Sequence, residues 1–266
     1  MRYRVMAITM FGGALSAQTL QPPPQYYNPA WSPDGERIAL ESSRDSRDGK
    51  LAIFTVRRDG GELRRLTSPE FSAELPSWSP DGKRIVFSTD IEGDRKLFIM
   101  AADGSNAKAI PNTLLGFYAT FSPDGQWILF AVQDGPRAAT TRVAVIRPDG
   151  SDRRLLGDST SSNEGPRWST DGTRVIYTEV PILKPNPGES MRDLAKRRNA
   201  MSHAVSISLN GTDKRTISEE VARRLSRDPA VTRDGRWEAL VKQNGDSAEV
   251  VVRDRSNSKE ARIIPR

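Results

Sequence analysis

With 266 residues, 36% of them hydrophobic, the chain can bury a sizeable core, which excludes a disordered protein. Its 20 glycines and 18 prolines favour many short strands joined by turns. The formal net charge of +6 requires a nucleic-acid role to be considered, whereas the absence of cysteine excludes disulfides, thiolate metal sites and a lipid-modified cysteine.

The first predicted element is a signal peptide over residues 1–17. Arg2 and Arg4 give a positive start, an uncharged apolar run follows, and Leu15-Ser16-Ala17 ends it with small residues. This run is too short to span a bilayer, so a membrane anchor is the weaker interpretation. We therefore expect export to the periplasm or the exterior, with a short N-terminal segment at 18–28 and the main domain at 29–266.

Five segments of that domain share one pattern. An aromatic or apolar residue is followed by Ser or Thr, a turn that ends in Asp-Gly, and an apolar run. The segments are 29–40, 76–87, 119–130, 166–177 and 229–240, with starts 47, 43, 47 and 63 residues apart. This spacing is typical of one propeller blade of about 40–45 residues, with extra length in the fourth copy.

The repeated residues are best explained by turn geometry and packing. Proline fixes φ near −65°, Asp bonds back to the backbone, and Gly takes the left-handed position that closes a hairpin. The residue before the Ser is large enough to pack between neighbouring sheets, and Val231 is the one copy without an aromatic ring. The structural repeat positions are Trp31, Asp34, Gly35, Trp78, Asp81, Gly82, Phe121, Asp124, Gly125, Trp168, Asp171, Gly172, Asp234 and Gly235.

Each copy precedes two further short apolar runs, so the repeat unit is four antiparallel strands, here termed A to D. The chain is therefore predicted to be an all-β protein, a β-propeller with five four-stranded blades and a short helical insertion in the fourth. The blades are expected at about 29–70, 71–115, 116–160, 161–220 and 226–266. A two-layer β-sandwich would not need the same hairpin five times, while closure as a six-bladed ring stays open.

The pattern W-S-P-D-G-x-R-I-x-F, with a following D-G and R-R-L-T, resembles the WD40-like (PD40) repeats of the TolB propeller family. The resemblance covers roughly Pro29 to Pro265. It implies a periplasmic propeller that binds partners, including a peptidoglycan-associated lipoprotein, within an envelope-spanning system. The sequence departs from TolB in two ways: the separate α/β domain is not found before the first copy, and five units stand where TolB has a six-bladed ring.

Strand order predicts which end of the propeller binds. In a four-stranded blade, the A–B and C–D turns share one face and the B–C and D–A connections share the other. We call these the tight-turn face and the loop-rich face, and expect ligand contacts on the latter, because variable loops on a rigid frame carry binding residues. The candidate binding residues are Arg44, Asp90, Phe117, Tyr118, Arg137, Glu164, Met191, Arg192 and Leu194.

The longest connection, residues 180–202, predicts an extended proline-containing half and a helix at 189–201. Two interpretations are open: a solvated helix that packs on the rim, or a docking element over the channel mouth.

The sequence offers little chemistry for catalysis, so no catalytic, metal or cofactor residues are assigned. It contains no G-x-S-x-G motif and no phosphate-binding glycine loop, and its single histidine, His203, lacks partners for a triad. Basic doublets are spread along the chain and do not predict nucleic-acid binding.

The predicted function is an exported scaffold, not embedded in the membrane, that binds an envelope protein or peptide, a lipoprotein included. The alternatives are a hydrolase or lyase that uses channel carboxylates, and a structural assembly module. Convergent carboxylates with raised pKa values would favour the enzyme.

Overall fold

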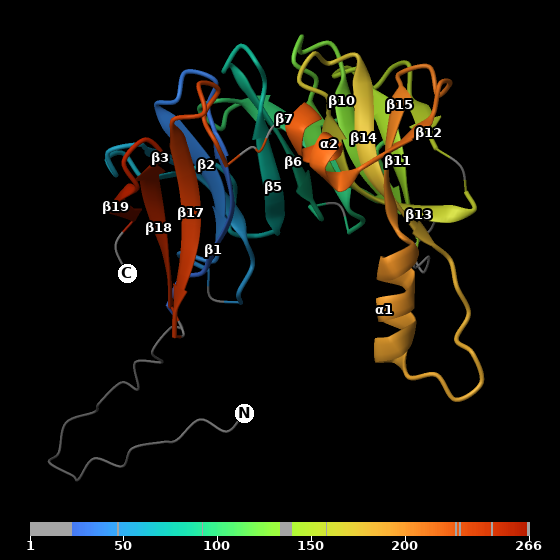
Figure 1. Ribbon diagram of the computed structural model, residues 1–266. Coiled ribbons are helices and arrows are strands. Elements are labelled where there is room, and N and C mark those ends of the chain that lie inside the picture. Colours follow the sequence, from blue (N-terminus) through green and yellow to red (C-terminus); the bar gives the residue numbers. More distant parts are fainter. Residues whose placement is uncertain are drawn as a thin grey trace, which may run out of the picture.

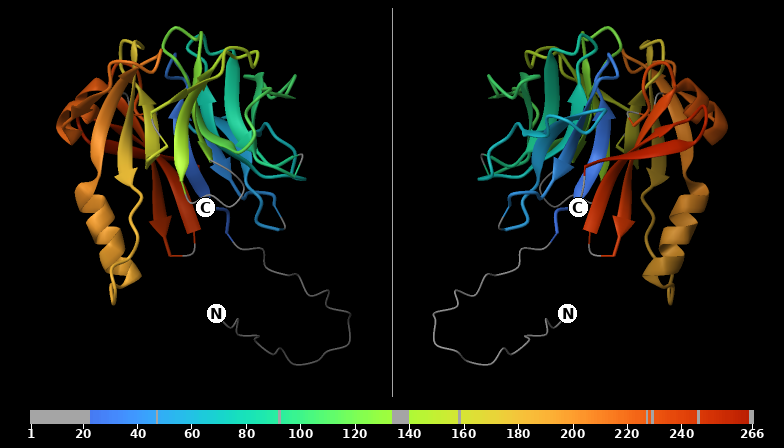
Figure 2. Two further views of the ribbon diagram at one scale, coloured as in Figure 1. Left: turned by 90° about the vertical axis from the view of Figure 1, so that its right-hand side faces the viewer. Right: turned by 90° about the vertical axis from the view of Figure 1, so that its left-hand side faces the viewer.

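The computed structural model describes residues 23–264 except 47, 92, 134–139, 158, 227, 229 and 246. The predicted signal peptide and Arg137 lie outside the described residues. Five antiparallel sheets stand side by side around a central axis, as expected of a β-propeller (Figures 1 and 2). Neither described helix is long and apolar enough to cross a membrane.

Four of the sheets have four strands, in chain order, as the repeat predicts. Blade 1 contains β1 (Tyr26–Trp31), β2 (Arg37–Ser42), β3 (Ala52–Arg57) and β4 (Arg64–Arg65). Blade 2 contains β5 (Ala73–Trp78), β6 (Arg84–Thr89), β7 (Lys96–Ala101) and β8 (Lys108–Ala109). Blade 3 contains β9 (Gly116–Phe121), β10 (Ile128–Gln133), β11 (Thr141–Ile146) and β12 (Arg154–Leu156). Blade 4 contains β13 (Ser161–Trp168), β14 (Arg174–Pro181), β15 (His203–Ser208) and β16 (Arg215–Ile217).

Blade 5 differs from the others. Its described strands are β17 (Trp237–Asn244), β18 (Ser247–Asp254) and β19 (Lys259–Ile264), which correspond to strands B, C and D. The expected strand A is reduced to an isolated bridge between Val231 and Glu238. The preceding chain is held by blade 4 instead, where Thr170 N donates to Leu225 O at 2.7 Å.

The repeated turns have the predicted chemistry. Ser79 Oγ and Lys83 N donate to Asp81 Oδ1 at 2.5 and 3.0 Å, and Gly82 has φ 69°. These hydrogen bonds hold the pKa of Asp81 below its usual value, because they stabilise the charged carboxylate. The same hydroxyl–carboxylate bond forms at Asp34, Asp124, Asp171 and Asp234. The repeated Asp residues are therefore turn residues.

In blades 1, 2 and 4, the repeated tryptophan joins the blade to the one before it. Trp78 Nε1 donates to Ala30 O at 3.1 Å, and Trp168 Nε1 donates to Thr120 O at 3.2 Å. Trp31 Nε1 donates to Ala230 O of blade 5 at 2.9 Å, so blade 5 precedes blade 1 around the axis. The spatial order is 5, 1, 2, 3, 4.

Hydrophobic clusters follow that order. Separate clusters of buried side chains join blades 5 and 1, 1 and 2, 2 and 3, and 3 and 4. Within the described part of the chain, no cluster joins blades 4 and 5, and Figure 1 shows these two sheets apart at the front of the molecule. The propeller is therefore an open arc of five blades. We call the space between blades 4 and 5 the seam.

Two helices are added to the sheets. The predicted insertion helix is α1 (Met191–Met201), between β14 and β15. The second helix, α2 (Glu219–Leu225), lies in the D–A connection between blades 4 and 5. Its buried Ala222 packs on Ile176 and Ala204, on the face of blade 4 that borders the seam.

Candidate functional site

The loop-rich face is shaped by a bulge in strand A of blades 1 to 4. The pairing register shifts in β1, β5, β9 and β13, three to four residues before each strand ends. The residues at these shifts have positive φ: Asn28 at 48°, Leu75 at 58°, Tyr118 at 54° and Gly165 at 59°. Leucine and tyrosine rarely adopt this conformation, and such strain is often stored at functional sites. Strands β1, β5 and β9 contact one another in turn, so the bulges surround the centre of this face.

A buried carboxylate fixes the first two bulges. Glu41 Oε1 accepts hydrogen bonds from Asn28 Nδ2 at 2.8 Å and from Leu75 N at 2.5 Å. Glu41 is 3% exposed, and its burial raises the pKa of the carboxyl group. Its role is therefore to connect the bulges of blades 1 and 2.

The neighbouring acid, Glu74, is also engaged. Its Oε2 lies 2.9 Å from Arg95 Nη2, and Ser72 Oγ donates to its Oε1 at 3.2 Å. Its negative charge adds to the raised pKa of Glu41. Two neighbouring carboxylates are what an enzyme would need, but both groups are held by bonds within the chain.

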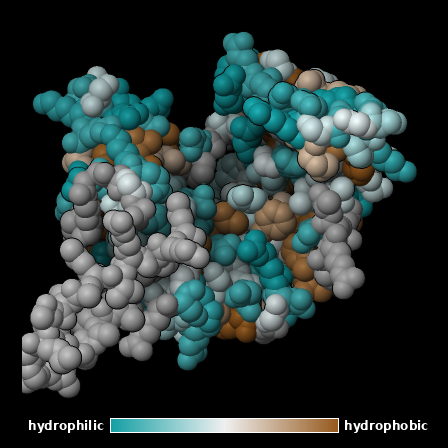
Figure 3. Space-filling model, turned by 90° about the horizontal axis from the view of Figure 1, so that it is seen from below, coloured by the Kyte–Doolittle hydropathy of each residue, from teal (hydrophilic) through white to brown (hydrophobic). Residues whose placement is uncertain are grey.

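Exposed apolar side chains gather on the same face. Tyr118 is 51% exposed and its ring centre lies 5.2 Å from that of Phe117. Figure 3 shows this face hollowed at its middle, with apolar residues within the hollow and an opening at one edge. The large exposed hydrophobic residues at this end of the molecule are Tyr27, Ile91, Leu114, Tyr118, Ile182, Met191 and Met201.

Helix α1 projects beyond the loop-rich face (Figure 1). Ser190 Oγ caps it by accepting from Asp193 N, and Arg197 forms a two-bond ion pair with Glu189. That ion pair lowers the pKa of Glu189 to about 2. Leu194 is buried, at 6% exposed, whereas Met191 is 74% exposed. The N-terminal half of the helix is thus fixed to the loop before it, while the side chain of Met191 is exposed.

The sequence-predicted binding residues are placed as follows. Arg44 is partly buried and donates to Tyr26 Oη at 3.1 Å, and exposed Asp90 accepts from Ser72 N at 2.9 Å. Phe117 is half-buried, and Leu194 is buried and anchors its helix. Tyr118, Glu164, Met191 and Arg192 are exposed on the loop-rich side.

The sequence-predicted set did not include the bulge residue Leu75 or the exposed residues Tyr27, Ile91, Leu114, Ile182 and Met201. An apolar residue inside a predicted B–C or D–A connection was the available signal for Ile91 and Leu114.

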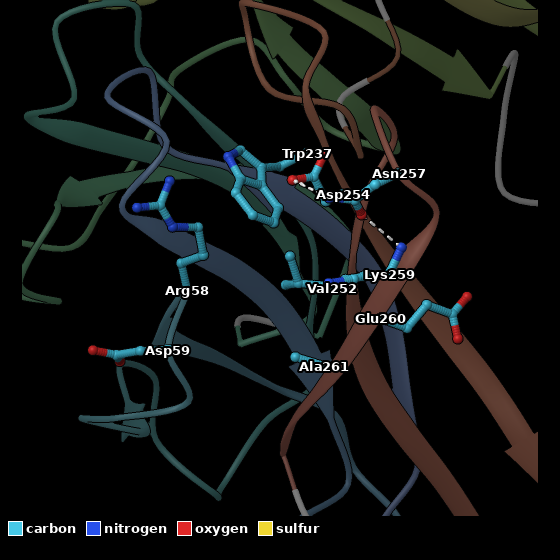
Figure 4. A pocket seen from close by; sticks show the side chains of 9 residues that line it. All are labelled: Arg58, Asp59, Trp237, Val252, Asp254, Asn257, Lys259, Glu260 and Ala261. Carbon is cyan, nitrogen blue, oxygen red and sulfur yellow. Dashed lines mark hydrogen bonds between the residues drawn. The ribbon is translucent and has the colours of Figure 1, made fainter.

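One pocket of about 450 Å³ lies on the opposite face, between the C–D turns of blades 1 and 5 (Figure 4). Arg58 and Arg236 lie 5.2 and 4.8 Å from the centre of the Trp237 ring. Asn257 Nδ2 donates to Asp254 Oδ2 at 3.4 Å and Asn257 Oδ1 accepts from Lys259 N at 2.9 Å. Because the main polar and aromatic groups already contact one another, we assign this pocket no ligand.

Metal-binding clusters were sought among His, Cys, Asp and Glu of residues 23–264, omitting the undescribed positions. No group of three or more that could hold a metal ion was found there. His203, half exposed, has its Nε2 3.4 Å from Glu179 Oε2.

Repeated four-stranded sheets around an axis, punctuated by Ser-Pro-Asp-Gly turns, define a β-propeller built from WD40-like repeats. The chain belongs to the TolB β-propeller family: the TolB beta propeller domain (PD40) matches residues 20–185, more than half of its length.

One curated relative and two solved structures illustrate the likeness. The chain is 30% identical over 163 residues to the uncharacterized protein Atu1656 of Agrobacterium fabrum. The aligned region covers 58% of this chain and 54% of that protein. TolB from Acinetobacter baumannii has a TM-score of 0.56 at 17% identity, over 90% of this chain and 53% of that one. A putative TolB from Agrobacterium tumefaciens has a TM-score of 0.57 at 16% identity, over 90% and 80%. The chain thus spans about half the length of that curated relative, and at these identities the structural matches establish the fold alone.

Proposed function

We propose that this chain is an exported scaffold of the cell envelope that binds a protein or peptide with its loop-rich face. The observation that carries the proposal is the gathering of exposed apolar side chains at that end. Tyr118 and Met191 represent the two parts of this surface, the strand bulges and the insertion helix. Rigid aromatic anchors and adaptable methionines suit contacts with polypeptide side chains.

The tight-turn face provides the contrast. Its turns carry Asp, Ser, Gly and charged residues. Among the described residues, one large exposed hydrophobic side chain lies beside these turns, that of Leu225, whose carbonyl accepts from Thr170 N. An interaction driven by apolar burial would therefore favour one end of the molecule.

The two alternatives have less support. A hydrolase or lyase needs a carboxylate free to exchange a proton with substrate, whereas Glu41 is enclosed by Asn28 and the Leu75 backbone. A purely structural module would not need strained bulges beside the exposed ring of Tyr118.

Site-specific photo-cross-linking in cells that export the protein tests the proposal. We expect p-benzoylphenylalanine at Tyr118 or Tyr27 to give covalent adducts with an envelope protein. The same group at Lys83 or Gln126, exposed on the tight-turn face, should give none. Equal labelling from both faces, or adducts only from Lys83 and Gln126, would contradict the assignment of the binding face.

A further inference from the structure

The wall of blade 5 that borders the seam departs from the repeat at one strand pair. In blades 1 to 4, the first residue pair between strands B and C on the corresponding side is apolar and buried. These pairs are Ile38 with Val56, Ile85 with Met100, Ile128 with Ile146 and Val175 with Ile207. In blade 5 the same register holds Glu238 opposite Arg253. A position that is core elsewhere is therefore an ion pair here.

Further ion pairs extend across that wall. Arg253 Nη1 lies 3.1 Å from Glu238 Oε2, and its Nη2 lies 2.9 Å from Glu260 Oε1. Lys242 also pairs with Glu260, and Arg262 pairs with Glu249. A buried protein surface almost never contains this many charged side chains. We therefore conclude that this wall of blade 5 is adapted to contact with water.

The C–D turn of blade 5 has lost its glycine. A Cβ at Gly60 would lie 2.6 Å from Ile263 O, and one at Gly104 would lie 2.9 Å from Leu66 O, both in the preceding blade. Asn257 occupies the equivalent turn position in blade 5, where its N–H bonds to Asp254 O as Gly60 N bonds to Arg57 O. Gly60 has φ 86°, whereas in blade 5 the left-handed residue is Ser258, at 59°, and not Asn257. The C–D turn of blade 5 is therefore built differently from the turns that approach a preceding blade.

The inner edge of β17 is exposed to this seam. Ala239 N donates to Ala230 O at 2.8 Å, which fixes the inward direction of alternate backbone groups. Val241 and Gln243 share that direction, since strand residues alternate. Blade 4 shows how this edge is normally covered: Ser161–Glu164 of strand A pair with Thr178–Pro181, the residues equivalent to 241–244. In the described chain, nothing pairs with the backbone of Val241 and Gln243 on that edge.

We infer that the inner edge of β17, from Val241 to Asn244, binds an extended segment of another polypeptide as the absent lower half of strand A. This inference rests on the proposed function, in that the partner is a polypeptide. Main-chain hydrogen bonds supply the affinity, as in other cases of strand addition to an open edge. The seam opens this edge from the side, so an internal segment of a long chain can enter without threading a free end through a closed ring.

The chemistry of the segment follows from the two surfaces beside it. Side chains of the bound segment that point toward the seam would contact the charged wall at Glu238 and Lys242, so they should be polar. Side chains of the bound segment that point toward blade 1 would contact β1, which itself contacts β17. These side chains should be small or apolar. An alternating polar and apolar segment fits this site.

Binding of a fluorescein-labelled, end-capped hexapeptide of alternating Thr and Val tests the inference. Gln243→Pro removes the inward N–H at an edge position where no strand bond is lost, so the fold should be kept. Gln243→Ala removes the side chain but keeps that N–H. We expect wild type and Gln243→Ala to bind within about twofold of each other and Gln243→Pro to bind about fivefold or more weakly.

Two controls complete the experiment. The same peptide with its edge-facing amides N-methylated should not bind, and peptide binding should slow amide exchange at Val241 and Gln243. Equal binding by Gln243→Pro, or no binding of the hexapeptide to wild type, would overturn the inference. If cross-linking at Tyr118 succeeds while this experiment fails, the loop-rich scaffold stands and the edge site is rejected.

Discussion

We expect Trp78→Ala to lower the free energy of unfolding by about 3–5 kcal/mol, because it removes a large buried ring and leaves a cavity. Trp78 is 8% exposed in the cluster between blades 1 and 2, where its Nε1 bonds to Ala30 O. Urea unfolding monitored by circular dichroism measures the change.

The repeat itself provides matched controls for Trp78. Trp78→Phe copies blade 3, where Phe121 fills this position, and should cost about 1 kcal/mol for the lost hydrogen bond. Val231→Ala changes the equivalent position in blade 5, which faces no preceding blade, and should cost about 1 kcal/mol or less. A Val231→Ala loss as large as that of Trp78→Ala would show that the ring does not act through the neighbouring blade.

The second large effect concerns the charged wall of blade 5. Replacing Glu238 and Arg253 together with isoleucine and valine restores the apolar pair that the other blades have. Because this wall faces the seam and adjoins Leu240 and Val251, we expect an exposed apolar face and concentration-dependent self-association, measured by analytical ultracentrifugation.

The control for that variant is the charge exchange, Glu238→Arg with Arg253→Glu, which keeps the wall polar and should sediment as wild type does. A more stable apolar variant that sediments as wild type would mean that blade 4 already covers this wall.

Local chemistry explains why the propeller could be predicted. The Ser-Pro-Asp-Gly turn closes through hydrogen bonds among its own residues, such as Ser79 with Asp81. Each hairpin can therefore be predicted from its own repeat, independently of the neighbouring blades. The repetition of that hairpin along the chain then predicts the sheets and their order around the axis. The helix at 191–201 was predictable for the same reason, since Ser190 caps it and Glu189 pairs with Arg197 nearby in sequence.

The seam depends on contacts between distant parts of the chain and was not predicted. Two residues mark it in the sequence: Val231 lacks the ring that would reach a preceding blade, and Asn257 stands where the other C–D turns have a glycine. Neither departure identifies the seam from the sequence alone, because a left-handed φ also explains glycine at this turn position.

In the candidate site, too, local features were predictable and contacts between distant residues were not. Strand order identified the loop-rich face and placed Tyr118 and Met191 on it. It did not foresee the bulges, because Glu41 holds Leu75 from another blade. It also could not separate Leu194, which faces the protein, from Met191, which faces solvent.

Spin-label distances between equivalent A–B turns test the open arc most directly. Glu36, Lys83, Gln126, Thr173 and Arg236 occupy the same exposed position in blades 1 to 5. We predict nearly equal distances for the neighbouring pairs 236/36, 36/83, 83/126 and 126/173, and a clearly longer one for 173/236 across the seam. A 173/236 distance equal to the others would mean a closed five-bladed ring and would contradict the open arc.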